Sequence, residues 1–186
     1  MKFSDDPKAD LIEHLKAHAV RTDGPFTLRS GETSSWYIDA RQTTFSGRGA
    51  AIVGEAVLAE VPDGVDAVGG LTMGADPIAV ATAIAAARAG RSVKAFSVRK
   101  AAKDHGTGGR LVGPLSAGDR VVALEDTTTT GSALAEAIEA LRAEGVVVEK
   151  AVALVDRSGS VAAEKIEDLG VPYVAIVRPS DLGVEG

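Results

Sequence analysis

Residues 125–132 combine two carboxylates with a run of hydroxyl side chains and a glycine. Glu125 and Asp126 follow the apolar residues 121–124, and four threonines, a glycine and Ser132 come next. Carboxylates accept hydrogen bonds from sugar hydroxyls or face a divalent metal ion. A Thr/Gly/Ser turn before a helix offers backbone amides and hydroxyls to a phosphate group. These residue types therefore predict a site for a phosphorylated sugar.

A strand at residues 120–124 and a helix from about Ala133 to Glu144 would position these groups, with Gly145 ending the helix. The carboxyl ends of parallel strands are where α/β sheets bind ligands. Because the strand is almost continuously apolar, we expect it at the centre of the sheet. The alternative is an ordinary strand–turn–helix connection capped by threonines, but four threonines and two acids exceed what a cap requires.

Strands and helices alternate from about Asp66 onward, which predicts an α/β fold with a parallel sheet covered on both faces. We expect one domain over residues 1–186, with a small N-terminal hood over about residues 1–45 and an α/β core over about residues 46–178. The central, mostly parallel sheet has five predicted strands and is flanked by helices. The strands lie at residues 66–70, 93–98, 120–124, 149–155 and 173–177, and the helices at residues 7–18, 47–60, 77–90, 133–144 and 161–169.

Composition narrows the class of protein. The chain has no cysteine, which excludes disulfides and cysteine metal sites. Its net charge of −6 argues against non-specific binding of nucleic acid. The polar N-terminus lacks the apolar core of a signal peptide, and no stretch has the apolar length of a membrane helix, so we expect a cytoplasmic protein without a membrane partner.

The segment VVALEDTTTTGSA, residues 121–133, resembles the phosphoribosyl-diphosphate (PRPP) binding motif of the type I phosphoribosyltransferases. The resemblance implies the type I phosphoribosyltransferase fold. It also implies that Glu125 and Asp126 hold the ribose hydroxyls of PRPP. Mg²⁺ is then the expected cofactor, bound mainly through PRPP and near these two carboxylates. The 5′-phosphate would be held by Thr127, Thr128, Thr129, Thr130, Gly131, Ser132 and Ala133.

Residues 96–114 carry a basic segment that resembles the catalytic loop of orotate phosphoribosyltransferases. The matching residues, in order, are Arg99, Lys100, Lys103, His105 and Gly106. The resemblance implies that the four charged or titratable side chains bind PRPP and neutralise the departing pyrophosphate. The alternative interpretation is a solvated basic loop without a ligand.

The segment LRSGETSSWYIDAR, residues 28–41, resembles the N-terminal signature of the same family. The resemblance implies that Arg29, Tyr37 and Ile38 contact orotate, the last two through their backbone. Without the resemblance, the pattern of this segment predicts a hairpin with a buried Trp36. Arg157 follows a predicted strand, and the resemblance implies that its guanidinium pairs with the orotate carboxylate while Thr129 helps to orient the base.

The turn at residues 69–79 fits a second PRPP contact. Part of the family carries a lysine in this turn, whereas this chain has Met73 and Gly74. Whether a side chain or only the backbone contacts pyrophosphate here stays open. We expect Asp76 to cap the helix that begins with Pro77.

Taken together, the resemblance implies transfer of a phosphoribosyl group from PRPP to orotate, with Lys103, Asp126, Arg99 and His105 as the catalytic residues. It also implies a homodimer with shared active sites. The alternatives are a phosphoribosyltransferase for another base and a non-catalytic regulator that senses PRPP.

Overall fold

Six strands form the central sheet of the computed structural model, which describes residues 4–27, 31, 33–103 and 109–184. Five of the strands are parallel, and only β7 runs antiparallel to its neighbour β6. In order across the sheet the strands are β10 (Tyr173–Val177), β9 (Val147–Asp156), β8 (Arg120–Thr128), β5 (Ala67–Leu71), β6 (Lys94–Lys103) and β7 (Gly109–Val112).

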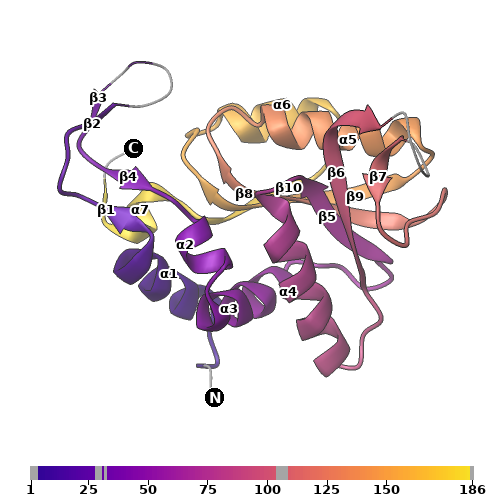
Figure 1. The fold of residues 1–186 in the computed structure, drawn as a ribbon, viewed down its shortest axis with the longest axis horizontal. Helices are drawn as coiled ribbons and strands as arrows, with labels where there is room; N and C mark the ends of the chain where they lie inside the picture. The colour runs from indigo at the N-terminus through magenta and orange to yellow at the C-terminus, as the bar shows by residue number, and fades with distance from the viewer. Residues whose placement is uncertain (1–3, 28–30, 32, 104–108, 185–186) are drawn as a thin grey trace.

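Helices cover both faces of this sheet (Figure 1). On one face lie α1 (Pro7–His18), α3 (Gly47–Leu58) and α4 (Ala75–Arg88), and on the other lie α5 (Ser132–Ala143) and α6 (Val161–Asp168). The central strand β8 explains why both faces must be covered. Its residues Val122 and Leu124 belong to the core beneath α3 and α4, whereas Val121 and Ala123 belong to the core beneath α5. Side chains alternate between faces along a strand, so an uninterrupted apolar run requires a core on each side.

Small residues set the spacing between α3 and α4. A Cβ atom on Gly54 would lie 2.5 Å from the carbonyl oxygen of Ala81, so only glycine permits this approach. The alanine-rich sequence of α4 presents little bulk to its neighbours. This packing holds the middle of α4 against α3, and the N-terminal end of α4 borders the site described below.

The hood lies at one end of the sheet and combines α1 with two short antiparallel strand pairs (Figure 1). Leu11 and Leu15 of α1 are fully buried in the same core as Val122 of the sheet, so the hood and the sheet share apolar packing. The remaining elements are β1 (Val20–Arg21), paired with β4 (Tyr37–Ile38), β2 (Phe26–Thr27), paired with β3 (Thr33–Ser34), α2 (Arg41–Thr44) and, at the C-terminal end of the sheet, α7 (Pro179–Leu182).

The predicted strands all exist, and the strand at residues 120–124 is central as expected, between β5 and β9. Two predictions need correction. The polar stretch at residues 99–113 is not a plain loop, because β6 continues to Lys103 and β7 adds a sixth strand. This hairpin lies at the sheet edge and is largely solvent-exposed, so its residues carry none of the apolar alternation by which strands are predicted.

The second correction concerns β8, which continues through both acids to Thr128. Its pairing with β9 continues to Thr128 and Asp156, so backbone hydrogen bonding, rather than apolar character, sets its end. Among the described residues, no helix combines the length and apolar character needed to cross a membrane.

Candidate active site

Glu125 and Asp126 lie in the last part of β8. Glu125 is largely withdrawn from water, and its Oε2 atom has no hydrogen-bond partner among the described residues. Burial, and then the adjacent charge of Asp126, raises the pKa of Glu125 to about 8, with an opposing effect from the Lys100 charge. A buried carboxyl with an unused oxygen can serve a ligand hydroxyl or a cation.

Asp126 lies against the turn between β5 and α4. A Cβ atom at Gly74 would be 2.8 Å from Cγ of Asp126, so only glycine lets the turn approach this closely. Oδ1 of Asp126 accepts a hydrogen bond of 2.6 Å from the backbone N–H of Thr127. The peptide bond between Thr72 and Met73 in this turn is cis, and the Met73 side chain is exposed.

The expectation that Asp76 caps α4 is wrong. The helix begins at Ala75 with Gly74 at the N-cap position, so Asp76 lies inside the first turn. Its Oδ2 accepts a hydrogen bond of 2.7 Å from the hydroxyl of Thr72 and thereby ties the turn to the helix. The sequence could not show this, because an Asp-Pro pair fits either position equally well.

The Thr/Gly/Ser segment forms a tight turn into α5. The Thr128 hydroxyl accepts a hydrogen bond of 2.9 Å from the N–H of Gly131, whose φ of +70° lies in the left-handed region. The side chains of Thr130 and Ser132 are hydrogen-bonded to each other at 3.0 Å, and both are exposed. The first N–H groups of a helix lack partners four residues back, so this turn presents amides and hydroxyls to an anion.

Lys165 of α6 also approaches this turn, and no sequence pattern indicated that it would. Its Nζ donates a hydrogen bond of 2.9 Å to the hydroxyl of Ser132. A cation at this point adds to the attraction that the helix start already has for a phosphate.

The predicted basic residues are only partly brought to this site. The charge of Lys100 reaches Glu125, as the pKa of that carboxyl records. Arg99 instead contacts the hairpin, where its Nη1 donates to the carbonyl of Gly109 at 3.5 Å. The side chain of Lys103 and the whole of His105 lie outside the described residues.

The hood contributes a segment around β4. Tyr37 is partly exposed, and Ile38 is buried. Arg29 lies outside the described residues. Arg41, which sequence reasoning missed, bonds to Oδ1 of Asp39 at 2.7 Å. Asp39 raises the pKa of Arg41 most, and the charge of Asp126 adds to the effect, so this hood cation lies within electrostatic reach of the acidic pair.

Arg157 lies directly beside the Thr/Gly/Ser turn, because its backbone N–H donates to the carbonyl of Thr128 at 2.9 Å. Its guanidinium lies over the ring of Trp36, with Cζ 4.2 Å from the ring centroid. The Nε atom is buried and has no hydrogen-bond partner among the described residues. Burial lowers the pKa of Arg157, as expected for a cation withdrawn from water. The sequence pointed to Arg157, but nothing in it indicated the contact with Trp36.

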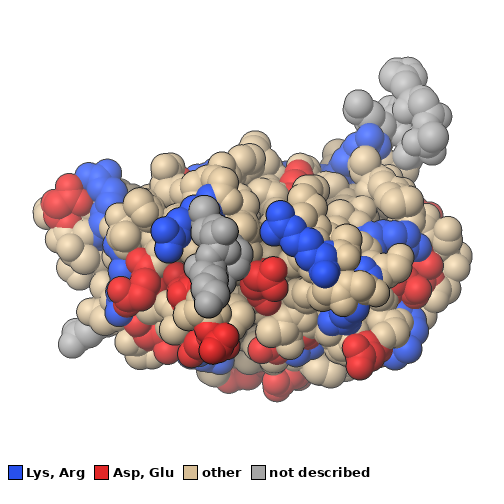
Figure 2. All heavy atoms as spheres, turned by 90° about the horizontal axis from the view of Figure 1, so that it is seen from below, with Lys and Arg blue, Asp and Glu red and all other residues tan. Residues whose placement is uncertain are grey.

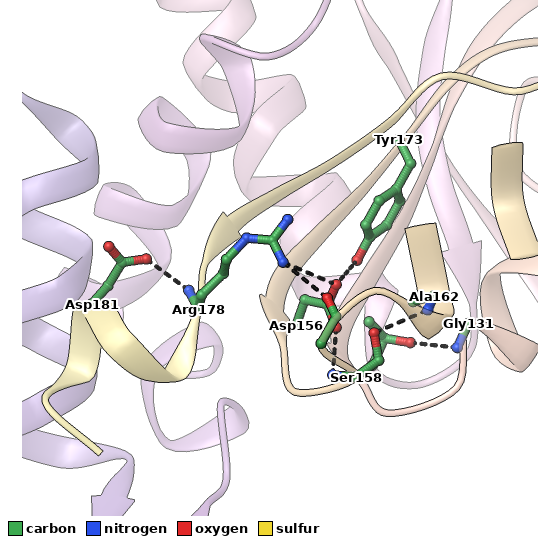
Figure 3. Close-up of polar contacts among 9 residues, drawn as sticks. Gly131, Asp156, Ser158, Ala162, Tyr173, Arg178 and Asp181 are labelled. Carbon is green, nitrogen blue, oxygen red and sulfur yellow. Dashed lines mark hydrogen bonds and ion pairs between the residues drawn. The ribbon is translucent and has the colours of Figure 1, made fainter. Parts of the chain in front are cut away.

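A polar network around the buried Asp156 fixes the backbone on either side of Arg157 (Figure 3). Oδ1 of Asp156 accepts from the N–H of Ser158 at 2.7 Å, and Oδ2 accepts from the Tyr173 hydroxyl at 2.9 Å. Arg178 adds an ion pair to Asp156 at 3.9 Å and donates to the carbonyl of Gly159 at 3.2 Å. Burial and then the hydrogen bond to Asp156 raise the pKa of Tyr173, so its hydroxyl stays protonated.

The larger of two cavities among the described residues borders the site. One of about 520 Å³ is lined by Asp156, Arg157, Ser158, Gly159, Arg178, Pro179 and Ser180, so Arg157 is open to solvent on that side. The other, of about 340 Å³, lies between α1 and α3. Its lining includes none of the predicted site residues and consists of Asp10, Glu13, His14, Ala17, His18, Arg48 and Ile52.

The acidic pair fits Mg²⁺ as a partial ligand set. Mg²⁺ prefers oxygen ligands, and the unpartnered Oε2 of Glu125 beside Asp126 offers them. The described residues contain no cluster of three or more side chains able to hold an ion by themselves. These two carboxylates thus suit an ion that takes its other ligands from a phosphorylated substrate and water.

No protein-family model matches the chain. Its sequence is 45% identical to orotate phosphoribosyltransferase of Streptomyces avermitilis over 183 residues, which are 97% of this chain and 100% of the relative. It is 43% identical to the orotate phosphoribosyltransferase of Corynebacterium glutamicum strain R over 180 residues, covering 96% of this chain and 95% of the relative. The chain belongs to the orotate phosphoribosyltransferase family.

Solved structures of this family have the same architecture. Orotate phosphoribosyltransferase of Mycobacterium tuberculosis in complex with PRPP matches with a TM-score of 0.81 and 34% identity, covering 96% of this chain and 100% of that one. Adenine phosphoribosyltransferase of Leishmania donovani, at 15% identity and a TM-score of 0.63, shares the fold alone. The predicted type I phosphoribosyltransferase fold is therefore confirmed.

Proposed function

We propose that this protein transfers the 5-phosphoribosyl group from PRPP to orotate, giving orotidine 5′-monophosphate and pyrophosphate, in pyrimidine biosynthesis. The observation that carries the proposal is the position of Arg157. The backbone N–H of Arg157 bonds to the turn that suits the ribose phosphate, and the Nε donor of its guanidinium has no hydrogen-bond partner among the described residues. A base with its own carboxylate is the partner that such a guanidinium recognises, and orotate is such a base.

The reaction needs no covalent nucleophile. As the bond from the anomeric carbon to the pyrophosphate oxygen breaks, positive charge develops on the ribose while the orotate nitrogen forms the new bond. Glu125 and Asp126 would hold the ribose hydroxyls and stabilise that positive charge. A cation beside Glu125 would favour its ionised form, whereas burial favours its neutral form in the unliganded chain. Residues 127–133 would hold the 5′-phosphate through the amides and hydroxyls at the start of α5, with Lys165 beside them.

The leaving pyrophosphate requires cations. We assign this task to Arg99, Lys100, Lys103 and His105, with Lys103, Asp126, Arg99 and His105 as the catalytic residues. Support comes from the Lys100 charge, which already acts on Glu125, and from the sequence order of the basic segment. Mg²⁺, held near Glu125 and Asp126 and mainly by PRPP itself, would neutralise further charge on the pyrophosphate.

Orotate would lie between the hood and the Thr/Gly/Ser turn. Arg29, the backbone of Tyr37 and Ile38, and Thr129 complete its predicted contacts with Arg157. The electrostatic contribution of Tyr37 to the pKa of Arg157 supports this arrangement, because it places the two side chains in the same neighbourhood.

We further propose that the hood and the α/β core act as one domain and that two chains form a dimer with shared sites. The exposed apolar side chains of Val80 and Ile84 lie one turn apart on α4, and Met73 is exposed just before that helix. Such an exposed apolar surface suits a second copy of the chain.

We also propose that the protein is cytoplasmic and that it has no nucleic-acid or membrane partner. On the face shown in Figure 2, Lys and Arg side chains are interspersed with Asp and Glu and form no continuous basic surface. This pattern, with the net charge of −6, does not favour the neutralisation of nucleic-acid phosphates.

A base panel tests the proposal. The protein receives PRPP and Mg²⁺ with orotate, uracil, adenine, guanine or xanthine, and pyrophosphate release is measured, with Asp126→Asn as the inactive control. We expect pyrophosphate release with orotate and with none of the other four bases. Release with a purine but not orotate would indicate a transferase for another base, and PRPP binding without release would indicate a regulator.

A further inference from the structure

Trp36 forms a platform for the cation of Arg157. The residue is 4% exposed, and the guanidinium carbon lies 4.2 Å from the ring centroid. The N–H groups of a guanidinium lie in its plane. A ring that covers one face therefore leaves the donor edges available while restricting rotation of the group.

The platform is held in place by its own segment. The Ser34 hydroxyl donates to the carbonyl of Trp36 at 2.7 Å and accepts from the Trp36 N–H at 3.3 Å. Strand β4 directly follows Trp36 and pairs antiparallel with β1. In this pairing Tyr37 lies opposite Arg21, and Ile38 lies opposite Val20. The indole therefore reaches Arg157 from a fixed hood segment rather than from a free chain.

Arg157, in contrast, is fixed at its backbone but not at its charged end. Its N–H bonds to Thr128, and the adjacent Asp156 network holds the turn that follows. The Nε donor remains buried without a partner, and the ion pairs formed among the described residues do not include Arg157. A long side chain without a polar partner samples several rotamers unless packing restricts it. The ring of Trp36, which lies against the guanidinium, is a contact that can supply this restriction.

We propose that Trp36 is a positioning residue for orotate selection: it holds the guanidinium of Arg157 flat, so that its N–H edge meets the carboxylate of the base. The inference rests on the proposed function and adds a specificity role for a residue that does not itself pair with the carboxylate. The competing explanation is that Trp36 only fills apolar space between the hood and the core.

The test compares Trp36→Leu, which removes the ring, with Trp36→Phe, which keeps an aromatic face. Trp36→Leu should raise the KM for orotate roughly tenfold, the scale of a desolvated cation–π contact, while kcat and the KM for PRPP change little. Trp36→Phe should recover most of the orotate affinity. Phe45→Leu is the control, because Phe45 is a 60% exposed aromatic at the end of α2 in the hood and should leave the orotate KM unchanged.

A double-mutant cycle separates positioning from space filling. In an Arg157→Leu background, Trp36→Leu should cause no further loss of orotate affinity, because the group that it positions is gone. Additive losses, or equal rises in the KM for orotate and for PRPP, would overturn the inference. If Trp36→Leu does not fold, Trp36→Met takes its place in the same cycle.

The proposed function can fail separately. If the wild-type protein releases pyrophosphate with orotate but Trp36→Leu retains its orotate KM, only the inference about Trp36 is wrong. If the wild-type protein does not use orotate at all, both are wrong.

Discussion

Replacing Glu125 by glutamine should stabilise the protein without ligands, in a manner that depends on pH. The pKa of Glu125 is about 8 in the folded chain, against an ordinary value of 4.5, because burial and the charge of Asp126 disfavour its ionised form. Between these values the unfolded chain has already lost the proton that the folded chain retains. The stability of the wild-type protein therefore falls as pH rises through this window.

The magnitude follows from the width of the window. Each pH unit between the two pKa values costs the folded state about 1.4 kcal/mol, so the cost at pH 9, above both values, is on the order of 5 kcal/mol. At pH 5 the cost is below about 1 kcal/mol. Glutamine has a similar shape but cannot ionise, so Glu125→Gln should recover most of this free energy at pH 9 and little of it at pH 5.

Urea unfolding of both proteins at pH 5 and pH 9, without PRPP or Mg²⁺, measures the effect. Glu139→Gln is the control, since it removes an exposed carboxylate from α5 and should change stability by less than about 0.5 kcal/mol at either pH. Equal stability of Glu125→Gln and wild type at pH 9, or the same gain at both pH values, would refute the reasoning. Because Glu125 serves PRPP in our proposal, the stabilised variant should also bind PRPP more weakly.

Two further predictions concern the phosphate turn and the dimer. Gly131→Ala would place a side chain at a φ of +70°, with its Cβ 3.0 Å from Cα of Ala162, so the affinity for PRPP and the free energy of unfolding should both fall. The control is Gly90→Ala, at a φ of +76° with no neighbour within 4 Å. It should lower the free energy of unfolding only by the backbone strain, about 1–2 kcal/mol. Mixing inactive Lys103→Ala with inactive Asp126→Asn should restore activity toward about a quarter of wild type if each site takes groups from both chains. Confirmed subunit exchange without recovered activity would mean that the basic segment serves its own chain.

The sequence alone predicted those parts of the site that are contiguous in the chain. The strand, the acidic pair, the Thr/Gly/Ser turn and α5 follow one another within residues 120–143, so local patterns suffice to order them. The central place of β8 was also predictable, because an uninterrupted apolar run needs a core on both faces. The end of β8 was not predictable from the sequence, because hydrogen bonds to β9 extend the strand past the apolar run to Thr128.

What only the tertiary structure decided is which distant residues meet. Gly74 approaches Asp126 because β5 and β8 are neighbours in the sheet. Arg41 of the hood, which is bonded to Asp39, lies close enough for the charge of Asp126 to raise its pKa further. From the sequence, Trp36 was predicted only as a buried aromatic, and Arg157, through the family resemblance, as a partner of the orotate carboxylate. Only the packing of the hood onto the core places the guanidinium over the ring. The sequence determined the chemical groups and their local order. The fold decided their protonation and their partners, because burial and proximity across the chain depend on three-dimensional packing.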